Sequence, residues 1–265
     1  LISQLSVAGV RYDVVDKRQK GRKIDIHFNG DLYSEQQIAA EKMLYNDIGV
    51  LAAATAFGKT VLGAYLIAEK KVNALVLVHN VEIMNNWIKD LSSFLTINEE
   101  LPTYTTPKGR VKKRSSLIGT FSSQKDSTTG IIDIAMITSL GREDNINELV
   151  RNYGMVIVDE CHHAAAVTHE NVLRAVTARY VYGMSATINR GDKQDKKMFM
   201  QLGPIRHRYT AKERAQKQGI GHYIYPRFTR LVDLNQSEDK NPSDYYRLIM
   251  QSELRNMQIV SDVID

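Results

Sequence analysis

The sequence predicts an α/β protein with a mostly parallel sheet and helices on both faces. Short continuous apolar runs, typical of strands buried on both faces, alternate along the chain with longer segments of helical periodicity. A loop of small residues ending in Gly-Lys-Thr, at positions 53–60, lies between one such run (48–52) and one such helix (61–69). Strand, small-residue loop, Gly-Lys-Thr and helix is the order that a phosphate-binding loop requires.

Composition limits the class of protein. The 265 residues are 43% hydrophobic, which suffices for the core of one large domain, and no apolar run is long enough to span a membrane. The chain begins with Leu1 and shows no signal-peptide pattern, so we expect a fragment. The lone Cys161 fits a reducing compartment, so we expect a cytoplasmic protein. The net charge of +5 weakly favours an anionic partner.

The opening segment carries two runs of alternating apolar and polar residues, 10–15 and 23–28, around a polar stretch that contains glycine. This pattern predicts a β-hairpin extension over residues 1–30. The segment is rich in Lys and Arg, and two interpretations stay open: a solvated surface or contact with nucleic acid. A helix is expected over 32–40, with Ser34 as its N-cap and Gln37 completing a capping box.

The 53–60 loop carries the strongest chemical signal. Backbone N–H groups at the start of the following helix would point at phosphates, and the helix dipole favours negative charge there. Lys59 would reach the β- and γ-phosphates, and the Thr60 hydroxyl would hold Mg²⁺. The remaining loop residues expected to contact nucleotide are Ala54, Thr55, Ala56, Phe57 and Gly58. Ala53 replaces the usual first glycine, which leaves a positive φ at that position in question.

Further strands are expected at 74–78, 116–119, 131–137, 154–158 and 180–184, and further helices at 81–94, 145–151, 211–218 and 245–263. Polar residues that follow the strands include Thr138, Asp159, Glu160 and Ser185. In parallel sheets ligands bind at the carboxyl ends of the strands, so we expect these side chains to converge with Lys59.

The two adjacent carboxylates have a direct use beside a phosphate loop. Asp159 can hold Mg²⁺ together with Thr60, and Glu160 is placed to orient and deprotonate an attacking water. His162 and His163 lack partners at zinc-ligand spacing, and a hydrogen-bonding role for His162 is expected instead. Trp87 is expected in the core of the 81–94 helix. The 98–130 segment is expected to be a loop whose basic residues are either solvated or attract phosphates: Lys108, Arg110, Lys112, Lys113 and Arg114.

Together these motifs resemble the first RecA-like motor domain of a superfamily-two helicase of the DExH/DEAD type, in the branch of restriction-enzyme motors and repair helicases. The resemblance rests on the 53–60 loop, on 159–162 and on 185–187, and it covers roughly residues 31–208. It implies ATP and Mg²⁺ as ligands and Gln36 as an adenine contact, since an amide offers both donor and acceptor. It implies a coupling role for His162, Ser185, Ala186 and Thr187, and nucleic-acid contacts from His79, Asn80, Thr138 and Ser139. Asn80 stands where relatives often carry a basic or hydroxyl residue, which puts its phosphate contact in doubt.

The resemblance implies an ATPase that couples hydrolysis to movement on, or unwinding of, DNA or RNA, with DNA favoured. The alternative is a nucleotide-gated module that binds nucleic acid or protein without productive turnover. Residues 209–265 are expected to form a linker and the first helix leading to a second motor domain, which would supply an arginine finger. We therefore expect this chain to bind ATP–Mg²⁺ and hydrolyse it feebly. The 13–31 segment with the motor also resembles helicase-like proteins of prokaryotic defence systems, which implies nuclease or primase modules as further partners.

Overall fold

The computed structural model describes residues 2–106, 108–142, 145–162, 167–186, 195–219, 226–228 and 241–264. The chain divides into two compact units, residues 1–217 and 218–265. The first unit contains every predicted site residue. Thr187 and His163 lie outside the described residues.

The first unit is built on a seven-stranded sheet with the strand order β13-β2-β12-β11-β3-β8-β7. Every neighbouring pair in this sheet is parallel, which confirms the predicted fold class. The strands are β2 (Ile48–Ala53), β3 (Ala74–Val78), β7 (Ile118–Phe121), β8 (Ile132–Met136), β11 (Met155–Asp159), β12 (Tyr180–Ser185) and β13 (Ile205–Tyr209).

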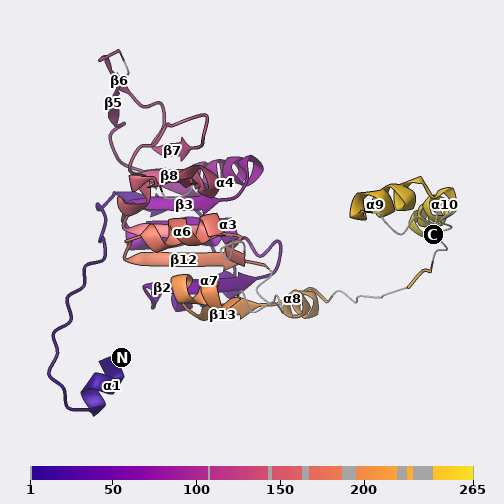
Figure 1. Cartoon of the computed structure of the whole chain (residues 1–265), viewed down its shortest axis with the longest axis horizontal. Coiled ribbons are helices and arrows are strands. Elements are labelled where there is room, and N and C mark those ends of the chain that lie inside the picture. Colours follow the sequence, from indigo (N-terminus) through magenta and orange to yellow (C-terminus); the bar gives the residue numbers. More distant parts are fainter. Residues whose placement is uncertain are drawn as a thin grey trace. The chain divides into compact units, whose positions relative to one another are not determined.

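Two hydrophobic clusters flank the sheet, because successive strand residues face opposite sides. Leu51 and Ala53 belong to one cluster, and Val50 and Ala52 to the other. The first face is covered by α2 (Ser34–Leu44), α3 (Lys59–Lys70) and α4 (Val81–Phe94), and the second by α5 (Ile137–Leu140), the 3₁₀ helix η1 (Glu148–Arg151), α6 (Val167–Ala175) and α7 (Asp195–Leu202). Figure 1 shows α6 and α7 over the face turned to the viewer. Burial on both faces explains why the strands are continuous apolar runs.

The opening segment does not form the predicted hairpin. Residues 10–15 are in no strand, and β1 (Ile26–Phe28) instead pairs antiparallel with β4 (Leu95–Ile97). A lone two-stranded hairpin gains little from its apolar side chains in water. The 23–28 run is stabilised because its Ile24 and Ile26 side chains are buried in the core. The 10–15 run has no such burial, since Val14 and Val15 are exposed. A short helix, α1 (Ile2–Val7), precedes these residues.

The buried side chain of Asn73 ties the opening segment to the amino edge of the sheet. Its Oδ1 accepts hydrogen bonds from the backbone N–H groups of Arg22 (3.0 Å) and Gly154 (3.1 Å). Its Nδ2 donates to the carbonyl oxygens of Gly130 (3.2 Å) and Asn152 (3.0 Å). One side chain thus satisfies four backbone groups from three segments of the chain, as a buried amide with two donor hydrogens and an acceptor oxygen can do.

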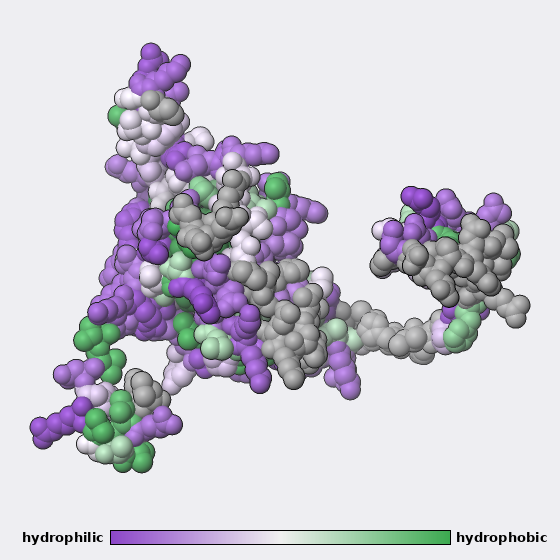
Figure 2. All heavy atoms as spheres, in the orientation of Figure 1, coloured by the Kyte–Doolittle hydropathy of each residue, from purple (hydrophilic) through white to green (hydrophobic). Residues whose placement is uncertain are grey.

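The 98–130 segment contains more structure than the sequence indicates. A hairpin of β5 (Thr103–Thr105) and β6 (Val111–Lys113) precedes β7, which lies two residues beyond the strand expected at 116–119. The Arg114 guanidinium stacks over the Tyr104 ring at 4.2 Å from its centroid. The hairpin's lysines are exposed, and Figure 2 shows hydrophilic residues over this end of the molecule.

Other predicted elements differ in extent. The helix expected at 145–151 is reduced to η1, because β10 (Asn145–Ile146) pairs with β9 (Gly141–Arg142). The helix at 211–218 is confirmed as α8 (Ala211–Gln218). In the second unit, the helix expected at 245–263 is two helices, α9 (Pro242–Gln251) and α10 (Glu253–Ile264). No helix in the described part of the chain is long and apolar enough to cross a membrane.

Candidate active site

The loop between β2 and α3 turns through two left-handed residues. Ala56 has φ 61° and Gly58 has φ 81°, whereas Ala53, where the sequence leaves a positive φ in question, lies within β2. At Gly58 a Cβ atom would come within 2.5 Å of Gln36 Nε2, so the position requires glycine in both conformation and space. The loop delivers the chain into the first turn of α3, where backbone N–H groups have no partner within the helix.

Gln36 holds this loop from the side of α2. Its Nε2 donates to the Phe57 carbonyl oxygen at 2.8 Å, and its Oε1 accepts from the Tyr33 N–H at 2.9 Å. The N-cap is therefore Tyr33, one residue before the expected Ser34, and Gln36 makes the return bond expected of Gln37. The Gln36 side chain is buried, and within the described part of the chain one N–H of its amide is left for another acceptor.

Lys59, Glu160, His162 and Ser185 form one polar network. Lys59 Nζ lies 3.4 Å from the Ala53 carbonyl oxygen and 3.8 Å from Glu160 Oε1. Glu160 Oε2 lies 3.2 Å from His162 Nδ1 and accepts from Ser185 Oγ at 3.3 Å, and the His162 and Ser185 atoms are 2.8 Å apart. The backbone at Glu160 is left-handed, with φ 45°, which is strained for a non-glycine residue.

Asp159 ends β11 with both carboxylate oxygens engaged. Oδ1 accepts from the Glu160 N–H at 2.9 Å, and Oδ2 accepts from the Trp87 indole N–H at 2.8 Å. Burial raises the pKa of Asp159, and the Trp87 hydrogen bond acts in the opposite direction. Cys161 is fully buried, and burial raises the pKa of its thiol.

The residues Asp159 and Thr60 would hold a magnesium ion only if a phosphate group supplied further ligands. In the residues that the structure describes, no three His, Cys, Asp or Glu side chains gather as a metal site. Mg²⁺ usually keeps several waters and takes one or two carboxylates plus substrate phosphates. Asp159 at the end of β11 and Thr60 in the first turn of α3 fit that pattern.

The residues expected to contact nucleic acid lie at the ends of β3 and β8. Asn80 caps α4, since its Oδ1 accepts from the Ile83 N–H at 2.8 Å, and its Nδ2 lies 3.2 Å from His79 Nε2. Thr138 and Ser139 lie in the single turn of α5. Thr138 is exposed, and Ser139 Oγ accepts from the Ser123 N–H at 3.0 Å.

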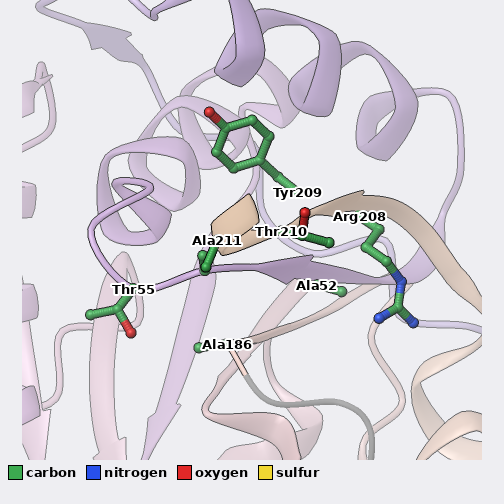
Figure 3. A pocket seen from close by; sticks show the side chains of 8 residues that line it. Ala52, Thr55, Ala186, Arg208, Tyr209, Thr210 and Ala211 are labelled. Carbon is green, nitrogen blue, oxygen red and sulfur yellow. The ribbon is translucent and has the colours of Figure 1, made fainter. Parts of the chain in front are cut away.

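A pocket of about 280 Å³ opens beside the loop on the second face of the sheet. Figure 3 shows Thr55, Ala186 and Arg208 around it, with the Tyr209 ring directed away from Ala186 and Ala52. The Tyr209 ring instead packs against Phe57, with centroids 5.1 Å apart. Arg214 of α8 donates to the Thr55 carbonyl oxygen at 2.8 Å.

Sequence reasoning missed the roles of Trp87, Tyr209 and Arg214. One signal was present for Trp87: an indole N–H that is buried usually finds an acceptor, so a core position for this residue also implied a polar partner. Nothing local indicates that Arg214 reaches Thr55, because 159 residues separate them.

Comparison with known proteins identifies the family. Residues 29–190 match the family model described as the type III restriction enzyme, res subunit. A protein of Acanthamoeba polyphaga mimivirus that carries the name of an ATP-dependent RNA helicase is 25% identical over 187 residues, which cover 69% of this chain and 33% of the relative. The DNA 3'-5' translocase XPB2 of Sulfurisphaera tokodaii is 22% identical over 187 residues, covering 71% of this chain and 38% of the relative.

A solved helicase structure has a similar fold. The crystal structure of the UvsW helicase from bacteriophage T4 aligns with a TM-score of 0.54 at 13% identity, over 77% of this chain and 75% of that one. The chain spans only 33% and 38% of the length of the two curated relatives named above. The chain belongs to the family of the type III restriction enzyme res subunit, and it contains a first motor domain of the superfamily-two helicase type.

Proposed function

We propose that the carboxyl edge of the sheet binds ATP with Mg²⁺ and that the chain is the ATP-binding half of a nucleic-acid-dependent ATPase. The observation that carries this proposal is the network of Lys59, Glu160, His162 and Ser185 beside the glycine-bearing loop. These residues follow or end β2, β11 and β12, which are neighbours in the sheet. Three strand ends thus bring a cation, a carboxylate and two hydrogen-bonding side chains to the start of α3.

The residues of the loop take the phosphates. The N–H groups of the first turn of α3 lie at the positive end of the helix dipole, so they would bind the negatively charged phosphates. Among the residues that the structure describes, the polar contacts of Lys59 Nζ are long, at 3.4 and 3.8 Å, so its ammonium can turn to the β- and γ-phosphates. Thr60 and Asp159 hold Mg²⁺, which when bound neutralises charge on those phosphates. Ala54, Thr55, Ala56, Phe57 and Gly58 shape the cradle, and Gln36 anchors it and offers its remaining N–H to adenine.

Glu160 is the general base. Its carboxylate lies 3.2 Å from His162 Nδ1 and 3.3 Å from Ser185 Oγ, so its direction depends on both. A base must be aimed at the proton that it removes. We therefore assign His162, Ser185, Ala186 and Thr187 a coupling role, because a shift at the carboxyl end of β12, where Ser185 contacts Glu160, would redirect the Glu160 carboxylate.

The partners follow from the family and stay part of the proposal. His79, Asn80, Thr138 and Ser139 would contact a DNA or RNA strand, with DNA favoured, and two relatives carry the names of an RNA helicase and a DNA translocase. A second motor domain of the same full-length chain would close the cleft and supply an arginine finger. Residues 1–30, 31–208 and 209–265 are the proposed extension, motor and linker, and nuclease or primase modules are proposed further partners.

The test is ATP hydrolysis by the full-length protein with and without single- and double-stranded DNA and RNA. We expect one of these nucleic acids to stimulate turnover, and Glu160→Gln to keep ATP binding while lowering turnover about 10²- to 10⁴-fold. This chain alone should bind ATP and turn it over slowly. If no nucleic acid alters the rate, and Glu160→Gln hydrolyses as slowly as the wild type, the protein is a nucleotide-gated binding module instead.

A further inference from the structure

Trp87 is the single tryptophan of the chain, and it lies in the middle of α4. Its side chain is 1% exposed, and its indole N–H donates to Asp159 Oδ2 at 2.8 Å. The other oxygen of Asp159 accepts from the Glu160 N–H. The carboxylate is therefore held at both oxygens, once by its own chain and once by a helix 72 residues away in sequence.

The core is shaped to receive this indole. At Gly63 of α3 a Cβ atom would lie 2.5 Å from Trp87 Cη2 and 3.0 Å from Cζ3. The same Cβ would lie 3.4 Å from Met184 Cε in β12. A glycine in the interior of a helix costs about 0.5–1 kcal/mol relative to alanine, and here it leaves the room that the indole occupies. The helix that carries Lys59 and Thr60 is thus fitted to the ring that holds Asp159.

The helix α4, which carries Trp87, begins at the edge of the sheet that is proposed to contact nucleic acid. Asn80 caps α4, and His79 precedes it at the end of β3. The helix is continuous from Val81 to Phe94, so its first turn and Trp87 move as one body. A displacement at Asn80 would change the position of the indole N–H relative to Asp159.

We propose that Trp87 is a positioning residue that fixes the Asp159 carboxylate for Mg²⁺ and ties its orientation to α4. This inference rests on the proposed function, since it takes Asp159 as the magnesium carboxylate. Hydrogen-bond donors that orient a metal ligand typically contribute about 10- to 100-fold to metal affinity or activity. A ring that served packing alone would contribute to stability and leave the magnesium requirement unchanged.

The matched pair for the test is Trp87→Phe and Tyr153→Phe. The first keeps an aromatic ring and removes the N–H that Asp159 accepts. The second removes a buried O–H that donates to Asp133 Oδ2 at 2.5 Å, in a strand whose register places Asp133 near the amino edge of the sheet. Each variant thus takes one donor from one buried carboxylate, and only the first carboxylate belongs to the candidate active site.

The first measurement is binding of a fluorescent ATP analogue to the 265-residue chain over a series of Mg²⁺ concentrations. We expect Trp87→Phe to need at least about tenfold more Mg²⁺ for half-saturation, with unchanged binding in the absence of Mg²⁺. Tyr153→Phe should keep the wild-type Mg²⁺ requirement. Equal Mg²⁺ requirements for Trp87→Phe and the wild type overturn the inference while leaving the proposed function standing. A wild-type chain that binds no nucleotide in Mg²⁺ overturns both.

The second measurement needs neither nucleotide nor a folded Trp87 variant. With one tryptophan in the chain, a ¹⁵N–¹H spectrum contains a single indole resonance. We expect Asp159→Ala to move this resonance to the shift of an unbonded indole and to speed its hydrogen exchange, while Tyr153→Phe leaves it in place. An indole resonance that is the same in Asp159→Ala and the wild type shows that the bond is absent in solution and overturns the inference.

Discussion

Replacing Gln36 with alanine separates two roles that its amide can play. The sequence resemblance makes it an adenine contact, whereas its bonds to Phe57 O and Tyr33 N make it an anchor of the phosphate loop. An anchor acts on the phosphates, which every nucleoside triphosphate shares. An adenine contact acts only on nucleotides that carry that base.

The magnitude follows from the two bonds that are lost. Each intramolecular hydrogen bond contributes about 0.5–1.5 kcal/mol net, so the pair contributes roughly 2 kcal/mol. If that whole free energy holds the loop in its binding conformation, nucleotide affinity falls by up to about 30-fold, since 1.4 kcal/mol corresponds to tenfold. The assay is equilibrium titration of the chain with fluorescent ATP and with fluorescent GTP, both in Mg²⁺.

Anchoring alone predicts that Gln36→Ala weakens ATP and GTP by the same factor, and the adenine contact proposed above adds a further loss for ATP. The control is Gln37→Ala, which removes the neighbouring amide that donates to the Leu32 carbonyl at 3.1 Å and leaves the loop untouched. We expect this control to bind both nucleotides like the wild type. A loss confined to ATP, with GTP affinity unchanged, refutes the anchoring role and supports an adenine contact.

Three further predictions address the surrounding structure. Asn73→Ala removes four hydrogen bonds of a buried side chain, so we expect the free energy of unfolding to fall by about 2–6 kcal/mol in urea unfolding followed by tryptophan fluorescence, with no change for the exposed Asn98→Ala; equal midpoints would contradict the anchoring of the opening segment. The Cys161 thiol is buried and its pKa is raised, so a thiol reagent such as DTNB should label the native chain far more slowly than the urea-unfolded chain, and equal rates would contradict its burial. Arg214→Ala removes the hydrogen bond to the Thr55 carbonyl, so nucleotide affinity should fall by about two- to tenfold. Unchanged affinity would show that α8 does not act on the loop.

Elements with a strong and simple pattern were predictable from the sequence. The 81–94 helix matches α4, and the apolar runs at 74–78 and 180–184 match β3 and β12 to within one residue. A buried strand leaves no choice of residue type on either face, so its pattern is unambiguous. The 10–15 run failed because alternation alone does not supply a partner strand or a face to bury.

Much of the candidate site could also be placed, because parallel topology brings strand ends to one edge. That rule predicted that Lys59, Glu160 and Ser185 would meet. It could not predict which atoms bond, because those pairings depend on helix packing. The bond from Trp87 to Asp159 requires α4 to pack against α3 with the indole beside Gly63, which no local sequence pattern indicates.

The most direct test of the central claim is ATP binding by this chain with and without Lys59. A charge-assisted hydrogen bond contributes about 1.5–3 kcal/mol, so Lys59→Ala should weaken fluorescent ATP binding in Mg²⁺ by roughly 10- to 150-fold. The control is Lys89→Ala, an exposed lysine of α4. The account predicts saturable binding by the wild type and Lys89→Ala, and a large loss for Lys59→Ala alone. Equal affinity of Lys59→Ala and the wild type would contradict it.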